Sequence, residues 1–232
     1  MIEKEEGIIV FLKKIKDNDI FIKILSNNDE LVSGMVYGGN SSKKKLTYQV
    51  GYFIEYLIIQ KNTNIVPTFK ADIIKPFISS IINDKFKSYS LLCILSLVNL
   101  SIVEGQKINE FYKSIKDIVI ILESKKHWIS FFCEWLFRLL QLIGYQIDYK
   151  NKKDYKYFNL ITQDFENSII ENSIAFPHEM LAHRSKISFK EVNAIFTIFE
   201  SIYIKNHLDN MNYKMPISFI NFKNSLLRQL KS

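Results

Sequence analysis

The first third of the chain alternates short hydrophobic runs with polar breaks. Turn-forming residues separate the runs at KDN, SNNDE, GGNSSKKK and QKNTN. Five close-spaced runs of this length predict a small closed β-barrel, and the OB-fold is the commonest barrel of that size. Pro67 and Pro76 mark its edge, because proline does not fit inside a paired central strand. The runs are rich in Ile, Val, Phe and Tyr and read GIIVFLKKI, DIFIKILS, ELVSGMVYGG, YQVGYFIEYLIIQ and NIVPTFKADII.

Beyond these runs the hydrophobic period changes from two to about 3.6. Apolar residues recur at i, i+3, i+4 and i+7 over Phe86–Val103, Ile108–Leu122 and Trp128–Ile143, which predicts three packed helices. Gly105 and Gly144 stand where such helices are expected to end.

The segment from Asp148 to Ser185 has weak periodicity, and we interpret it as an irregular insert with a hairpin. It carries lysines at 150, 152, 153 and 156 among the aromatic residues Tyr155, Tyr157 and Phe158. Helical pattern returns at Ser188, where Glu191 completes a capping box, and runs to about His207. Pro216 then opens a last helix, since proline is tolerated in a first helical turn.

These patterns predict an α+β fold. We expect an N-terminal OB-fold barrel over residues 1–76, followed by a helical domain over residues 77–232 with an irregular insert at about 148–187. The length of 232 residues suits one large domain or two small ones.

The chain is basic, with a net charge of +7 and a pI near 9.1. This favours an acidic partner, either nucleic acid or an anionic membrane surface. The alternative is that the lysines only form a solvated surface. The chain is also rich in Ile and Asn, and an AT-rich genome would favour all three residue types without any functional reason. The charge is locally unbalanced in two places. Lys43, Lys44 and Lys45 lie in a stretch without acids between Glu30 and Glu55, and no acid follows Asp209.

The lysine-rich stretch beside Gly38 and Gly39 suggests a flexible loop that contacts DNA. Lysines neutralise phosphates, and exposed aromatic rings stack on bases. The candidate DNA-binding residues are Lys43, Lys44, Lys45, Tyr37 and Tyr48, with Lys13, Lys14 and Lys16 as weaker candidates because Asp17 and Asp19 follow them. The alternative is that the tyrosines cover the barrel core and the lysines only solubilise a hairpin.

Signatures of catalysis are missing from the sequence. It contains no phosphate-binding loop, GxSxG or GxGxxG pattern. His178 and His183 are five residues apart, which does not match the spacing of a helical metal site. Cys93 and Cys133 lie in apolar helical runs and are expected to be core residues in a reducing compartment. We therefore expect a protein that is not an enzyme and needs no cofactor or metal.

The sequence also predicts a cytoplasmic protein with no membrane contact. Its start, MIEKEEG, is acidic, whereas a signal peptide begins with a positively charged region. The uncharged stretch from Ser88 to Val103 is too short to span a membrane and indicates a buried helix.

Residues 135–149, WLFRLLQLIGYQIDY, resemble a stretch of the recombination mediator family RecO. Trp135 takes its aromatic position, Gly144 and Tyr145 its Gly–aromatic pair, and Asp148 its acid, while Leu136 departs from the usual Glu. The opening strands with their Gly-plus-lysine loop and the closing helix pair are also similar to this family. We interpret Gly34 as incidental to the pattern.

The resemblance implies a DNA repair and recombination mediator that associates with the nucleoid. Such a protein binds single- and double-stranded DNA, anneals strands and helps load the recombinase RecA. It pairs with RecR and docks the C-terminal tail of single-stranded DNA-binding protein. An acidic, aromatic tail needs a cation for its carboxylate, and the candidates are Arg138, Lys205 and Arg228.

Many members of that family carry a four-cysteine zinc module in the insert. This chain has no cysteine after Cys133, so we expect the insert to fold without zinc around its own aromatic residues. A competing hypothesis from another class is a non-enzymatic adaptor that contacts only proteins through its helical scaffold.

Overall fold

The computed structural model describes residues 4–59, 66–75, 79–183 and 187–231, and the chain forms two compact units. The first unit is Met1–Glu123 and the second is Ser124–Ser232. The first unit thus contains helices as well as strands. The predicted domain boundary at residue 76 falls outside the described residues, so the division of the chain at that point stays a prediction.

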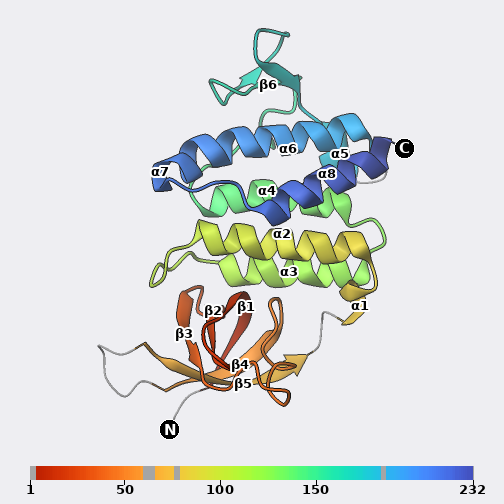
Figure 1. Cartoon of the computed structure of the whole chain (residues 1–232). Helices are drawn as coiled ribbons and strands as arrows, with labels where there is room; N and C mark the ends of the chain where they lie inside the picture. The colour runs from red at the N-terminus through yellow and green to blue at the C-terminus, as the bar shows by residue number, and fades with distance from the viewer. Residues whose placement is uncertain (1–3, 60–65, 76–78, 184–186, 232) are drawn as a thin grey trace. The chain divides into compact units, whose positions relative to one another are not determined.

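The strands of the first unit close into a five-stranded barrel, as the hydrophobic runs predict (Figure 1). Around the barrel the order is β1-β2-β3-β5-β4, and the fold is an OB-fold followed by helices. In β2 the alternating residues Ile20, Ile22 and Ile24 point inward and are at most 1% exposed. The strands are β1 (Glu5–Lys14), β2 (Ile20–Ser26), β3 (Leu31–Val36), β4 (Phe53–Ile59) and β5 (Thr68–Lys75).

The barrel closes through a short parallel contact between β3 and β5. Met35 pairs with Thr68, and the Met35 amide donates to the Pro67 carbonyl at 2.8 Å. A Cβ atom on Gly34 would clash with that carbonyl oxygen and lie 2.6 Å from Cε2 of Phe69. The interpretation of Gly34 as incidental is therefore wrong, because only glycine allows the two strands to approach this closely.

The helices of the first unit are attached to the barrel through the turn between β2 and β3. The Asp29 carboxylate accepts the backbone N–H of Glu110 at 2.9 Å and of Tyr112 at 2.8 Å, at the start of α3. The Ser33 hydroxyl donates to the Glu104 carboxylate at 2.6 Å. The helices are α1 (Ser79–Ile82), α2 (Lys85–Ser101) and α3 (Phe111–Ser124). Of these, α2 and α3 lie close to the predicted ranges, and α1 was not predicted.

The second unit packs its long helices around aromatic side chains. The Phe132 ring of α4 lies 4.9 Å from the Phe222 ring of α8 and 6.2 Å from the Phe196 ring of α6. The predicted capping box of Ser188 and Glu191 is present at the start of α6. The helices are α4 (Ile129–Leu142), α5 (His178–His183), α6 (Phe189–Tyr203), α7 (Asp209–Met211) and α8 (Ile217–Lys231), with a π-helix, η1 (Ile204–Leu208), after α6.

The insert projects beyond the helices of this unit (Figure 1) and contains a three-stranded sheet in the order β7-β6-β8. Phe158, Phe165 and Phe176 are buried, and their ring centroids lie between 5.0 and 6.4 Å apart. The expected aromatic core of the insert is thus confirmed. The strands are β6 (Tyr157–Asn159), β7 (Phe165–Glu166) and β8 (Ser173–Ala175).

The α-helix expected to reach His207 ends earlier, at Tyr203, and continues as the π-helix. The Asn206 carbonyl accepts the Tyr145 hydroxyl at 2.6 Å, and the Asn206 side chain bonds Gln163 in the insert at 2.7 Å. This carbonyl, within the π-helix, therefore links Tyr145 of the Gly–aromatic pair to the helix, and it also accepts the Asn210 side-chain amide at 2.7 Å.

Burial of the two thiols agrees with the sequence, since both Cys93 and Cys133 are fully buried and unpaired. None of the helices among the described residues combines the length and apolar character that crossing a membrane requires.

Candidate nucleic-acid interface

The residues between β3 and β4, 37–51, form an ordered chain of turns, which we call the lysine loop. Backbone amides of Ser41, Lys44 and Thr47 donate to the carbonyls three residues earlier at 2.8–3.1 Å. The Lys44 ammonium also donates to the Tyr37 carbonyl at 3.0 Å. The glycine-rich composition suggested a flexible loop, but these local bonds hold its backbone in one arrangement.

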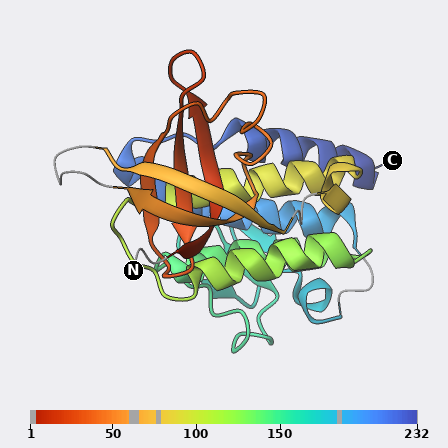
Figure 2. The same cartoon turned by 90° about the horizontal axis from the view of Figure 1, so that it is seen from below.

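The lysine loop is joined to the turn between β1 and β2. The Gly38 amide donates to the Asp19 carboxylate at 2.7 Å, and the Asn40 amide donates to the Asn18 carbonyl at 2.7 Å. Figure 2 shows the coiled loop beside this turn. Two candidate groups that are distant in sequence therefore share one end of the barrel.

We call this surface the basic barrel end. Its lysines are all exposed, and only Asp17 and Asp19 offset them within residues 13–19 and 37–51. One of these carboxylates, Asp19, is bonded to the Gly38 amide. The Tyr37 side chain is 60% exposed, so it remains a candidate for stacking on a base. The lysines of the basic barrel end are Lys13, Lys14, Lys16, Lys43, Lys44 and Lys45.

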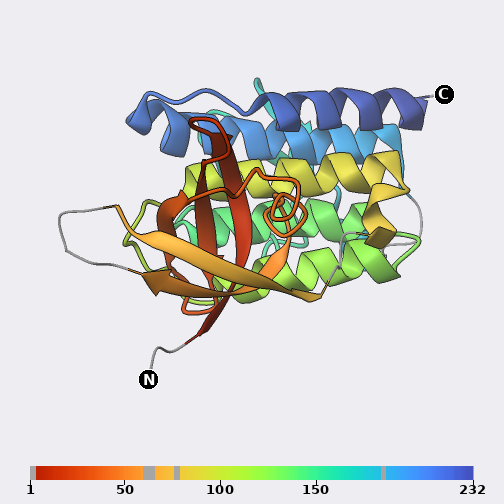
Figure 3. The same ribbon diagram turned by 60° about the horizontal axis from the view of Figure 1, so that its bottom comes forward.

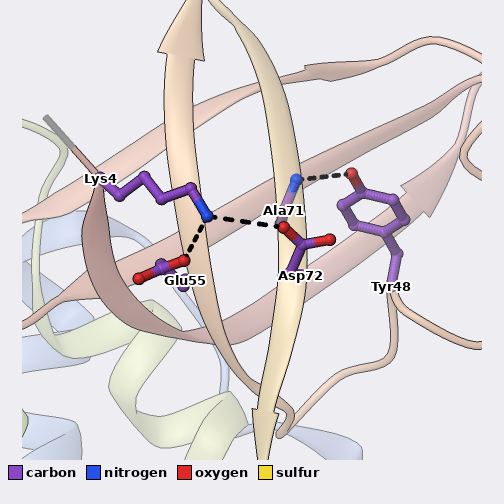
Figure 4. Close-up of polar contacts among 5 residues, drawn as sticks. All are labelled: Lys4, Tyr48, Glu55, Ala71 and Asp72. Carbon is purple, nitrogen blue, oxygen red and sulfur yellow. Dashed lines mark hydrogen bonds and ion pairs between the residues drawn. The ribbon is translucent and has the colours of Figure 1, made fainter. Parts of the chain in front are cut away.

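Tyr48 occupies a different place from Tyr37, because its side chain is only 5% exposed and packs in the barrel core. Its hydroxyl accepts the Ala71 amide of β5 at 3.0 Å (Figure 4). Burial raises the pKa of this phenol. The assignment of Tyr48 to DNA contact needs correction, since its ring has no open face for a base. It instead covers the core, which is the alternative stated above.

The face formed by β4 and β5 is electrostatically different. The Lys4 ammonium lies 2.5 Å from the Glu55 carboxylate and 3.8 Å from that of Asp72, on adjacent strands (Figure 4). The hydrogen bond to Glu55 raises the pKa of Lys4. Here a single lysine meets two acids, so the charge of Lys4 is offset within this cluster.

The three partner-binding candidates lie on separate parts of the second unit. The Arg138 guanidinium on α4 donates to the Gln141 side chain at 2.8 Å. Lys205 lies in the π-helix, where its ammonium donates to the Ile161 carbonyl at 3.3 Å. Arg228 is exposed in the last turn of α8.

Lys205 and Arg228 lie at opposite ends of α6. The Lys231 ammonium lies 6.0 Å from the centroid of the Phe189 ring, which places the end of α8 at the start of α6. Lys205 follows the other end of α6, about 24 Å away at 1.5 Å per residue. A single peptide carboxylate cannot contact both residues.

A shallow hollow of about 270 Å³ lies where the insert meets α5 and α6. Its polar groups already serve the fold, because His178 Nε2 bonds the Tyr155 carbonyl at 2.9 Å and Glu191 belongs to the capping box. Within the described part of the chain no three His, Cys, Asp or Glu side chains are placed to hold a metal ion. The hollow is lined by Ala175, Phe176, Pro177, His178, Glu179, Lys190 and Glu191.

Together, the OB-fold barrel, its basic end and the helices that follow define a barrel-plus-helical protein with a candidate nucleic-acid surface. No family model matches the chain. The chain is similar to curated proteins named DNA repair protein RecO.

The similarity to the protein from Rickettsia canadensis is 25% identity over 206 residues, which covers 84% of this chain and 85% of that protein. With the protein from Rickettsia akari, identity is 28% over 145 residues, or 62% of this chain and 60% of that protein. The protein from Rickettsia africae gives 27% over the same length.

Proposed function

We propose that this chain is a DNA repair and recombination mediator that binds single- and double-stranded DNA at the basic barrel end. It anneals complementary strands and helps load a recombinase onto DNA coated by single-stranded DNA-binding protein. The observation that carries this proposal is the joining of two lysine-bearing loops at one end of an OB-fold barrel. Similarity to curated proteins that are named for DNA repair supports it.

Electrostatics explains how this surface holds DNA. Each lysine that neutralises a phosphate releases a counterion, which favours binding and makes the affinity fall with salt. The bonded turns hold the lysine loop before binding, so little ordering of its backbone opposes association. Exposed Tyr37 offers a ring to an unstacked base. These contacts break no covalent bond, and we expect the protein to act by binding without turnover.

The first test removes the charge of the lysine loop. In the variant Lys43→Ala/Lys44→Ala/Lys45→Ala, affinity should fall alike for all sequences. The slope of log affinity against log salt should flatten by up to about three counterions. Fluorescence anisotropy with single- and double-stranded oligonucleotides across a salt series measures both quantities.

A matched control removes three exposed lysines from the helical part, in the variant Lys113→Ala/Lys125→Ala/Lys126→Ala. It changes the net charge equally and should keep the wild-type slope. An unchanged slope in the lysine-loop variant would contradict the proposed site. Partner binding that is insensitive to salt, with no DNA binding, would favour the protein-only adaptor.

The proposed partners are RecR and the C-terminal tail of single-stranded DNA-binding protein. We assign Arg138 as the anchor of the tail, because a guanidinium can pair with a carboxylate through two parallel hydrogen bonds. It lies beside the buried residues Phe137 and Leu139 on a helix rich in apolar side chains. Lys205 and Arg228 are alternative anchors, and their separation along α6 allows each to be tested alone.

Calorimetric titration of a tail peptide tests this assignment. Arg138→Ala should lose about 1.5 kcal/mol or more if the guanidinium contacts the carboxylate. Lys205→Ala and Arg228→Ala serve as controls, and each should bind as the wild type does. If one of them loses affinity instead, the anchor lies at that end of α6, and equal affinity in Arg138→Ala leaves this residue a structural role only.

A further inference from the structure

A second group of lysines lies on the insert, between the end of α4 and β6. Four lysines occur within residues 148–156, against the two aspartates Asp148 and Asp154. Lys150, Lys153 and Lys156 are exposed, and Lys152 is partly buried. The insert belongs to the second unit and the barrel to the first, so these lysines and those of the basic barrel end lie on different units.

Aromatic residues fix this segment at both ends. The Tyr149 ring lies 5.6 Å from the Phe137 ring of α4 and 5.8 Å from the Phe176 ring. At the other end the Tyr155 ring contacts Phe165 at 6.4 Å, and the Tyr155 carbonyl bonds His178. The segment from Tyr149 to Lys156 is therefore held in place, and we call it the insert arch.

The backbone of the arch is also bonded internally. The Tyr155 amide donates to the Lys152 carbonyl at 3.1 Å, and the Lys156 carbonyl accepts the Phe176 amide at 2.9 Å next to the small sheet. The Asn151 side chain donates to the Asp148 carboxylate at 2.9 Å. The rings of Tyr149 and Tyr155 pack against other aromatic rings, and Lys150, Lys153 and Lys156 are exposed. This arrangement suits phosphates better than an apolar peptide.

One lysine of the arch has a separate structural task. The Lys152 ammonium lies 4.7 Å from the centroid of the Tyr155 ring, within the range of a cation–π interaction. This contact joins two residues of the arch to each other. The three exposed lysines can be changed while this contact stays in place.

We propose that the insert arch binds the phosphate backbone of a second DNA strand while the basic barrel end holds the first. This inference rests on the proposed function, because the first strand must bind the barrel. The exposed ligands are the ammonium groups of Lys150, Lys153 and Lys156. Annealing requires two strands on one protein. Two cationic surfaces can each hold one strand through its phosphates, without recognising its sequence.

The experiment uses two non-complementary oligonucleotides of about 12 nucleotides, within the site size of one OB-fold. Base pairing then cannot join them, and native mass spectrometry counts the strands bound to each full-length chain. The variant Lys150→Ser/Lys153→Ser/Lys156→Ser should bind one strand where the wild type binds two. Its annealing rate with complementary strands should fall about tenfold or more, since phosphate contacts dominate the affinity for DNA.

Two controls separate this result from a general effect of charge or folding. The variant with arginine at the same three positions should keep both strands. The Lys113→Ala/Lys125→Ala/Lys126→Ala variant should also keep both. Circular dichroism of the serine variant should match that of the wild type, because Lys152 and the aromatic anchors are unchanged.

The outcomes for the two proposals differ. Binding of one strand and slow annealing by the serine variant supports the second surface. Binding of two strands and rapid annealing by that variant overturns it and leaves the barrel site standing. A wild-type protein that binds no strand overturns both proposals. A lysine-loop variant that still binds two strands overturns the barrel site and, with it, the two-surface arrangement.

Discussion

Gly34 and Tyr48 act on the same part of the barrel, where β3 and β5 meet for only a short distance (Figure 3). Gly34 lets the two strands approach, since any side chain would strike the Pro67 carbonyl. Farther along β5, the Tyr48 hydroxyl accepts the Ala71 amide in place of a strand partner. The lysine loop therefore completes the barrel wall as well as presenting charge.

At this scale we predict that Gly34→Ala destabilises the protein by about 1–3 kcal/mol, the usual cost of overpacking a close contact. The obstacle is a backbone carbonyl, which cannot rotate away as a flexible side chain can. The midpoint of urea denaturation measures the change. Gly105→Asn is the control, because Gly105 has φ +77° with open space around it, and Asn tolerates that conformation. Equal losses in the two variants would contradict the role of Gly34.

At the scale of elements, the insert shows how a small module is stabilised by side-chain packing. Its strands are two or three residues long and would not be stable alone. Phe176 contacts rings from several parts of the insert and from α4, and it is 6% exposed. These aromatic contacts form the core of the insert.

We predict that the purified protein holds no stoichiometric zinc and that a chelator leaves its melting temperature unchanged. Phe176→Ala should instead destabilise it by about 3–5 kcal/mol, because a large buried ring is lost. Ile169→Ala is the control in the same insert, since that side chain is 72% exposed and should cost little. Elemental analysis with one zinc per chain would refute this prediction and direct attention to His178 and His183.

At the scale of the whole molecule, both units contain a buried thiol. Burial raises the pKa of Cys133 to about 12 and that of Cys93 well above its ordinary 9.0. The folded protein keeps protons that the unfolded chain releases as the pH rises past 9.0. Their contribution to stability is therefore complete below the unfolded pKa and is lost progressively as the pH rises toward the folded pKa.

The free energy of unfolding should accordingly fall above about pH 9, with each thiol adding up to about 1.4 kcal/mol per pH unit. Buried Tyr48 should steepen the loss above its ordinary pKa of 10.0, because burial raises its pKa in the same direction. Urea denaturation at a series of pH values measures the slope. Cys133→Ala should be less stable at neutral pH but show a shallower slope, and an identical slope would rule out this thiol as a cause.

Periodicity was sufficient to predict the barrel and the long helices, because those elements bury one regular face. The capping box at Ser188 and Glu191 was equally visible, since it depends on two residues at fixed spacing. Hydrogen bonds between residues that are distant in sequence leave no such local pattern. Nothing in the local sequence indicates that Asp19 binds Gly38, or that Tyr48 and Tyr37, so close in the chain, differ in burial. The sequence thus predicted positively charged segments, but it did not predict that two loops come together to form the basic barrel end.

The π-helix at Ile204–Leu208 has a consequence for how this chain tolerates changes in length. A π-turn is equivalent to one additional residue inserted into an α-helix. Deleting one residue here would restore the ordinary α-helical winding, and the residues downstream would keep nearly their present orientation, because the wide turn absorbs the additional residue. The Asn206 carbonyl would then turn away from Tyr145, and the link to the insert through Gln163 would go with it. A single-codon deletion at this position should therefore keep the helix and cost mainly the local contacts with Tyr145 and the insert.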